Sequence, residues 1–234
     1  VSEPAHALLC QQGLAMPSKR HQRKPIALLD SSEITAVLAA PDLSTWIGRR
    51  DRTLLAVAIQ TGLRVSELIG LRREHVVMGS GAHVRCDGKG RKQRCTPLGR
   101  DTAAVLDGWL RRDLPMESAC VFPSVRGRPL SRDAVEELVT RYARRAQQAC
   151  PSLKQKRVSP HVLRHSSAMR LRAHGVDQSV IALWLGHESV ETTQMYMHAD
   201  LRLKEQALSR VDPLGVKPSR YRPADHLLRF LESL

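Results

Sequence analysis

The stretch TWIGRRDRTLLAVAIQTGLRVSELIGL, residues 45–71, holds the signals from which the fold can be followed outward. It predicts a helix over residues 45–60 that stops at Gly62, because glycine adopts the left-handed backbone of a helix C-cap at little cost. A second helix then begins at Arg64. The sequence therefore predicts an arginine at a helix start, pointing into a site.

The segments around this stretch predict further helices and one small sheet. Asp30 is followed by SSE, which offers an N-cap with Glu33 three residues on, so a helix is expected over residues 31–40. Residues 75–98 contain short apolar stretches, β-branched residues and four glycines, which favour an antiparallel sheet. We expect a mainly α fold with a small antiparallel β-sheet (α+β), a loop at 116–131, and the remaining helices at 100–112, 131–149, 160–174, 177–185, 189–197, 201–210 and 223–233.

The charge balance points to a polyanionic partner. Lysine and arginine number 37 against 23 acidic residues, which gives a net charge of +14. Nucleic acid is the favoured partner. An anionic membrane surface is disfavoured, because the basic residues are spread along the chain and are not gathered on one amphipathic helix.

The cysteines and the apolar runs bear on the compartment. The five cysteines form an odd set without a CxxC pair, which favours a reducing compartment, the cytoplasm. Apolar runs such as LLAVAI, residues 54–59, are far too short to span a bilayer, and the first ten residues lack the features of a signal peptide. The cysteines are Cys10, Cys86, Cys95, Cys120 and Cys150.

Tyr196 is the candidate nucleophile. It lies in WLGHESVETTQMYMH, residues 184–198, nine positions after His187. A phenol with an ordinary pKa near ~10 attacks nothing at neutral pH unless neighbours take its proton and stabilise the developing charge. Such neighbours stand in TGLRVSELIGL, DGKGRKQR and SPHVLRHSSAMRL, which begin at residues 61, 87 and 159. Together they suit attack on a phosphate, and they supply Arg64, Lys89, His161 and Arg164.

These motifs, in this order, resemble the catalytic domain of the tyrosine recombinases, the phage integrase and Xer type family. The resemblance covers roughly residues 25–205: an Arg follows TGL, a Lys stands in GKG, HVLRH matches the second box, and LGH precedes the Tyr by nine residues. It implies a site-specific recombinase that cleaves and rejoins double-stranded DNA through a 3′-phosphotyrosyl bond. It also implies no metal, no cofactor and no small-molecule substrate, with a homotetramer assembled on DNA.

The resemblance gives each residue a role. Tyr196 would attack the phosphodiester, Arg64 and Arg164 would clamp the phosphate oxygens, and His161 would accept the nucleophile's proton. Lys89 would protonate the leaving 5′-oxygen, and His187 would donate a hydrogen bond to the phosphate. Glu67 is expected to orient an arginine or histidine of the site, His165 to pack in its helix, and Arg91, Lys92 and Arg94 to position phosphates.

The same resemblance divides the chain. Residues 1–25 are interpreted as a helical remnant and a basic linker, like the tail of the extra N-terminal domain of family members. Residues 26–212 form the catalytic domain and 213–234 a C-terminal tail. The segment at about 201–211 is expected to pack onto a neighbouring protomer.

Three alternatives stay open. His161 and His165 are spaced i, i+4 as in some zinc sites, but the third ligand and the base of HExxH are missing. The chain could be a truncated, non-catalytic DNA-binding remnant of a mobile-element recombinase, or a DNA relaxase of the type IB topoisomerase kind. The sequence does not identify the DNA site or the outcome of recombination.

Overall fold

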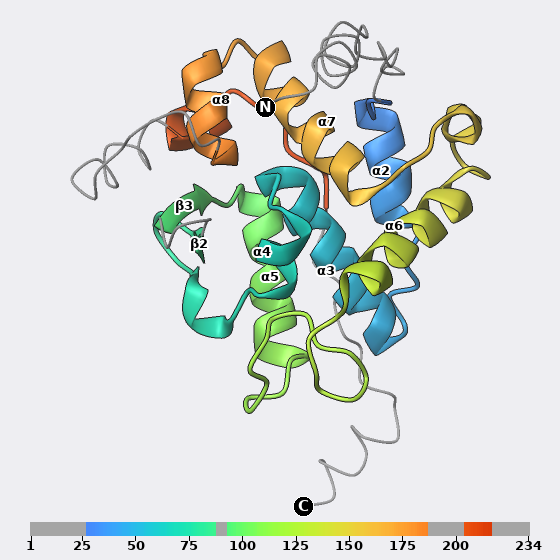
Figure 1. The fold of residues 1–234 in the computed structure, drawn as a ribbon, viewed down its shortest axis with the longest axis vertical. Helices are drawn as coiled ribbons and strands as arrows, with labels where there is room; N and C mark the ends of the chain where they lie inside the picture. Colours follow the sequence, from blue (N-terminus) through green and yellow to red (C-terminus); the bar gives the residue numbers. More distant parts are fainter. Residues whose placement is uncertain (1–26, 88–92, 187–203, 217–234) are drawn as a thin grey trace, which may run out of the picture.

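Helix α3, Trp46–Thr61, runs through the centre of the fold, and other helices pack around it (Figure 1). The computed structural model describes residues 27–87, 93–186 and 204–216. The Thr45 hydroxyl caps the start of α3 by accepting the Gly48 N–H at 3.0 Å, and Gly62 ends the helix with φ of 63°. The predicted stop at Gly62 is therefore confirmed, and α3 explains the LLAVAI run: residues 54–59 are buried because they form the core helix.

The other predicted helices within the described ranges are found, with ends that match the prediction or differ from it by a few residues. The predicted capping box is present at the start of α2: Asp30 accepts the Glu33 N–H at 2.9 Å, and Glu33 accepts the Asp30 N–H at 3.0 Å. None of the described helices combines the length and apolar content needed to cross a bilayer. The helices are α2 (Ser31–Ala39), α4 (Val65–Ile69), α5 (Arg100–Arg112), α6 (Arg132–Ala146), α7 (Pro160–Ala173) and α8 (Gln178–Leu185), with short 3-10 turns at Arg73–His75 and Pro151–Gln155.

The predicted sheet is confirmed as three antiparallel strands in the order β1-β2-β3, at one side of the molecule (Figure 1). They are β1 (Val76–Val77), β2 (His83–Asp87) and β3 (Gln93–Pro97). Cys86 of β2 lies directly opposite Arg94 of β3. Cross-strand partners point to the same face of a sheet, so Arg94 shares the face of a buried cysteine.

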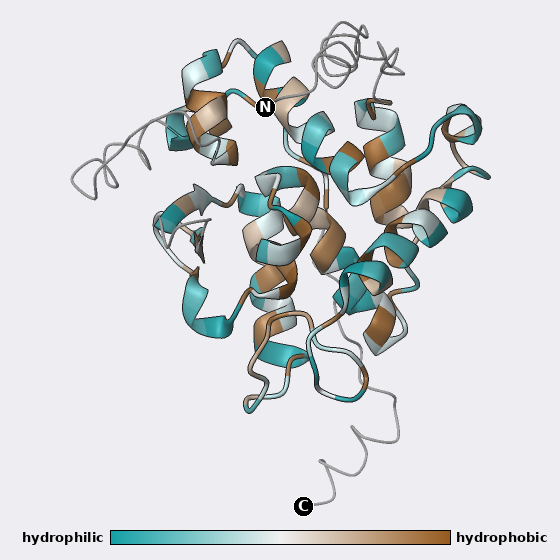
Figure 2. Cartoon of the chain, viewed as in Figure 1, coloured by the Kyte–Doolittle hydropathy of each residue, from teal (hydrophilic) through white to brown (hydrophobic). Residues whose placement is uncertain are grey.

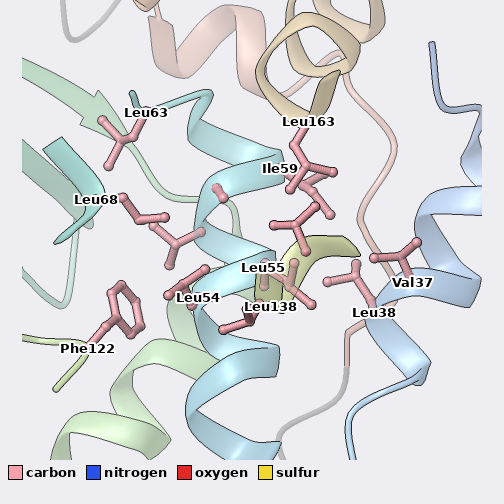
Figure 3. Close-up of a cluster of buried hydrophobic side chains, with 14 of the residues drawn as sticks. Val37, Leu38, Leu54, Leu55, Ile59, Leu63, Leu68, Phe122, Leu138 and Leu163 are labelled. Atoms are coloured by element: carbon pink, nitrogen blue, oxygen red, sulfur yellow. The ribbon is translucent and has the colours of Figure 1, made fainter. Parts of the chain in front are cut away.

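The core lies between α3 and its neighbours. Figure 2 shows apolar residues on the inward faces of these helices. In Figure 3, Leu54, Leu55 and Ile59 of α3 project from the central helix, Val37 and Leu38 of α2 approach from one side, and Leu163 of α7 lies at one end. Each fully buried leucine contributes about 1.5–3 kcal/mol relative to an exposed one. This packing fixes α7 against the end of α3, where Gly62 and Arg64 follow.

A second apolar cluster joins α7 and α8 to the described C-terminal segment. Ala207 is buried with Trp184 and Leu185, and residues 204–208 are helical. The Lys204 ammonium is buried and donates to the Cys95 carbonyl at 2.9 Å. Residues 204–211 pack on an apolar surface of α7 and α8 within their own chain. The expected contact of residues 201–211 with a neighbouring protomer stays a prediction. The predicted helices at 189–197 and 223–233 lie outside the described residues.

Candidate active site

Arg64 occupies the junction between α3 and α4. It is the N-cap residue of α4, with extended backbone, and lies two positions after the left-handed Gly62. A Cβ at Gly62 would meet the Leu185 side chain at 2.8 Å. Glycine is therefore required both by the backbone and by the close approach of α8. The side chain of Arg64 is 40% exposed, so it remains accessible from solvent.

Glu67 holds two arginines. Its carboxylate accepts the backbone N–H of Arg64 at 2.7 Å and the Arg64 Nη1 at 3.1 Å. It also accepts Nη2 of Arg94 at 2.7 Å. The Glu67 side chain is only 5% exposed, and its charge is compensated by these guanidiniums. The expectation that Glu67 orients an arginine is thus met by its contacts.

Arg164 reaches the same place from α7. The Ser159 hydroxyl caps this helix by accepting the Val162 N–H, and Pro160 occupies its first turn. One turn later, Arg164 donates from Nη1 to the Gly62 carbonyl and from Nη2 to the Leu185 carbonyl, the latter at 2.7 Å. Burial, with the nearby positive charges of Arg64 and Arg94, lowers the pKa of Arg164 to about 10. Arg164 is still cationic at neutral pH.

The end of α8 is the point at which the three arginines meet. The Leu185 carbonyl accepts from Arg94 Nη1 and Arg164 Nη2, and the Gly186 carbonyl accepts Arg64 Nη2 at 2.9 Å. Three guanidiniums and one carboxylate leave an excess of two positive charges here, directly before residue 187. Such a cluster suits the binding of a phosphate group, because each guanidinium can donate two parallel N–H hydrogen bonds to phosphate oxygens.

Comparison with known proteins assigns the family. The model of the Phage integrase family matches residues 27–202. A Sinorhizobium fredii protein named as an integrase/recombinase, y4rC, is 51% identical over 231 residues, which are 99% of this chain and 70% of the relative. Tyrosine recombinase XerD of Pseudomonas aeruginosa is 39% identical over 80% of this chain and 62% of its own length. The chain belongs to the phage integrase family.

Solved structures agree with this assignment. XerH site-specific recombinase, in a post-cleavage complex with a palindromic difH substrate, matches with a TM-score of 0.64 at 27% identity, over 83% of this chain and 57% of XerH. The mainly helical fold with a small sheet, predicted above, is thus that of the phage integrase family. The chain spans about three fifths of the length of XerD and XerH.

Of the remaining predicted site residues of this integrase-family chain, the structure describes one, His161. His161 lies on the first turn of α7, exposed, with its ring stacked on that of His165 at 6.0 Å between centroids. Within 27–87, 93–186 and 204–216, no three His, Cys, Asp or Glu side chains come together as a metal site would require. The other candidates, Lys89, His187 and Tyr196, lie outside the described residues.

Arg94 is the residue whose place the sequence prediction missed. It was expected to position DNA phosphates, but its side chain is 9% exposed and bonded to Glu67 and Leu185. The physical reason is its register in β3, opposite the buried Cys86, which directs it inward. In a strand with one buried face, alternation of apolar and polar residues could have indicated that Arg94 points inward. Residues 94–97 of β3 are all buried, however, so buried and exposed residues do not alternate along this strand.

Proposed function

We propose that this chain carries the strand-cleaving centre of a site-specific DNA recombinase, which breaks and rejoins double-stranded DNA through a covalent 3′-phosphotyrosyl intermediate. The observation that carries the proposal is the convergence of Arg64 and Arg164 on adjoining carbonyls at the end of α8. These arginines come from segments 100 positions apart and meet one residue before His187. The segment that contains the candidate nucleophile begins at the next position along the chain.

The proposed reaction is a transesterification that needs no redox partner. The Tyr196 oxygen forms a bond to phosphorus as the bond from phosphorus to the 5′-oxygen breaks. His161 accepts the phenolic proton, and Lys89 gives a proton to the departing 5′-oxygen. Arg64, Arg164 and His187 stabilise the added charge on the phosphate oxygens, where loss of one donor costs about 3–4 kcal/mol of transition-state stabilisation.

The proposed partner is duplex DNA. The net charge of +14 favours a polyanion, and the XerH relative was crystallised on its difH substrate. We further propose that four protomers assemble on two duplexes, because strand exchange joins ends from two sites. Rejoining conserves the energy of the phosphodiester in the tyrosyl bond, so the reaction needs no ATP.

Covalent capture tests this proposal. The full chain is incubated with a library of nicked duplexes of randomised sequence, in which the short 5′-hydroxyl strand diffuses away after cleavage and traps the adduct. Adducts that survive denaturing electrophoresis are recovered over successive rounds, and the modified peptide is identified by mass. We expect the wild type to be modified at Tyr196.

Two phenylalanine variants serve as matched tests. Tyr196→Phe should form no adduct, because the attacking oxygen is gone. Tyr142→Phe should still form it, because the Tyr142 hydroxyl donates to the buried Asp51 carboxylate at 2.9 Å and takes no part in the site. An adduct that persists in Tyr196→Phe, or a wild type that forms none, would refute the proposal. The second result would favour a DNA-binding remnant.

The same captured duplexes distinguish a recombinase from a relaxase of the type IB topoisomerase kind. A recombinase joins strands from two paired sites and yields exchanged products. A relaxase acts as a monomer and removes supercoils from a plasmid that carries a single site. Exchange between two sites is the expected outcome.

A further inference from the structure

Arg94 is the buried link between three segments that carry candidate site residues. It lies on β3, which begins just after the sequence segment 88–92 that contains Lys89. Its Nη2 donates to Glu67 of α4 at 2.7 Å, and its Nη1 donates to the Leu185 carbonyl at the end of α8. One planar guanidinium therefore fixes β3, α4 and α8 relative to one another.

The surroundings of Arg94 indicate that it does not contact DNA itself. Its side chain is 9% exposed, whereas that of Arg64 is 40% exposed. The Nε of Arg94 is buried as well, with no hydrogen-bond partner in the part of the chain that the structure describes. A phosphate can therefore reach Arg64 from solvent, whereas the Arg94 side chain is enclosed by the protein.

The glycine at the end of α8 allows this contact. Gly186 has φ of 67°, and a Cβ there would lie 2.1 Å from Nη1 of Arg94 and 3.1 Å from its Cδ and Cζ. The guanidinium therefore packs against the bare backbone of the turn that leads to His187. Arg94 also shares its two partners with the proposed clamp, since Glu67 bonds Arg64 and the Leu185 carbonyl bonds Arg164.

We propose that Arg94 is a positioning residue for strand cleavage. It holds Glu67 and the end of α8 in the arrangement that brings Arg64 and Arg164 together at the Leu185 and Gly186 carbonyls. This inference rests on the proposed function. Lysine cannot replace Arg94, because an ammonium is a point charge and lacks the planar fork that spans a carboxylate and a carbonyl on two different elements.

The test compares Arg94→Lys with a matched control, Arg50→Lys. Arg50 is also a buried arginine, 7% exposed at its side chain, and pairs with Asp51 at 2.7 Å and with the Pro123 carbonyl at 2.8 Å. Its contacts do not include Glu67, Arg64 or Arg164. Either substitution keeps the charge and removes a buried guanidinium that bonds both a carboxylate and a backbone carbonyl, but only Arg94 adjoins the proposed site.

Four quantities are measured on a duplex captured by the wild type: the single-turnover rate constant of adduct formation, its amplitude, the Kd for DNA, and the melting temperature. We expect Arg94→Lys to lower the rate constant about 100-fold, the size of effect expected from a misplacement of roughly 1 Å in reacting groups. Its Kd should stay within about threefold of the wild type, because no phosphate contact is lost. Arg50→Lys should lower the melting temperature similarly and leave the rate constant unchanged.

Each other result contradicts the positioning role. A wild-type rate constant in Arg94→Lys, or an equal loss in Arg50→Lys, would make Arg94 merely structural. A loss confined to Kd would make it a DNA ligand. Arg94→Met, which fills the same space without a charge, is the second variant if the lysine variant does not fold, and it should show the same slow cleavage.

An activity-independent measurement separates this inference from the proposed function. Hydrogen exchange of the backbone amides should rise at α4 and at the end of α8 in Arg94→Lys, and not in Arg50→Lys. A wild type that forms no adduct would refute the proposed function. Unchanged exchange at both places would refute the link through Arg94, whether or not the wild type is active.

Discussion

The turn at Gly186 offers a quantitative test of the geometry at the end of α8, by comparison with Gly175. Both residues have left-handed backbone, with φ of 67° and 73°. A Cβ at Gly175 would meet no atom within 4 Å, whereas at Gly186 it would lie 2.1 Å from Nη1 of Arg94. Gly175→Ala therefore measures backbone strain alone, and Gly186→Ala measures the same strain plus the displacement of Arg94.

The two costs can be estimated separately. Left-handed backbone costs alanine about 1–2 kcal/mol, and the reduced freedom of the unfolded chain offsets up to about 1 kcal/mol, so Gly175→Ala should lose about 1 kcal/mol. In Gly186→Ala the guanidinium must move away from Leu185 and Glu67. Breaking a buried ion pair costs about 3–5 kcal/mol, so with the backbone cost the total loss should be about 4–6 kcal/mol.

Urea unfolding followed by circular dichroism at 25 °C gives both values. For a chain of this size, each kcal/mol lowers the melting temperature by about 2–4 °C, so the two variants should differ by roughly 10 °C. In an Arg94→Ala background, Gly186→Ala should cost no more than Gly175→Ala, because the clash has been removed. Equal losses for the two glycine variants in the wild-type background would refute the placement of Arg94 against this turn.

Three further outcomes are expected. Burial by itself raises the pKa of Glu33, but hydrogen bonds from Lys156, Ser152 and the Asp30 N–H outweigh it and hold that pKa below its usual value of 4.5. The ionised Glu33 therefore stabilises the fold above pH 4.5, and this contribution is lost as the pH falls. Glu33→Gln should lower the free energy of unfolding at pH 7 and should make that free energy fall less steeply below pH 4.5, as measured by urea titrations at a series of pH values. Lys89→Ala should cleave ordinary duplex slowly, and its rate should recover on a duplex with sulfur in place of the 5′-oxygen, because a thiolate leaves without a proton. Lys92→Ala should cleave both duplexes at the wild-type rate. If the sulfur-containing duplex does not restore the rate of Lys89→Ala, the general-acid role of Lys89 is excluded. Affinity for nonspecific duplex, measured by fluorescence anisotropy, should fall by about 10³-fold between roughly 50 and 200 mM salt, and a salt-independent affinity would argue against phosphate contacts.

Local features were predictable from the sequence because they depend on neighbouring residues. The capping box of Asp30 and Glu33 spans three positions, and the stop at Gly62 depends on one glycine. The bounds of α5 are those predicted, since apolar spacing alone defines its buried face. The motifs also indicated the family, because they combine several residue types at fixed spacing.

The arrangement of the site is decided by contacts between distant parts of the chain. Arg164 bonds Gly62 across 102 positions, Arg64 bonds Gly186 across 122, and Arg94 bonds Leu185 across 91. No local pattern distinguishes the partly exposed Arg64 from the buried Arg94, since both are arginines in basic or polar surroundings. Their difference arises from strand register and from the packing of α7 and α8 against α3.

The sequence by itself determined which residues are available for phosphate chemistry and which helices present them. Only the tertiary structure decided that Glu67 is shared by two arginines, that the end of α8 gathers three, and that residues 204–211 pack on their own chain. The physical reason is that burial and hydrogen bonding depend on which surfaces meet. Secondary structure follows mainly from local preferences, whereas a site assembled from α4, β3, α7 and α8 exists only once the core around α3 has formed.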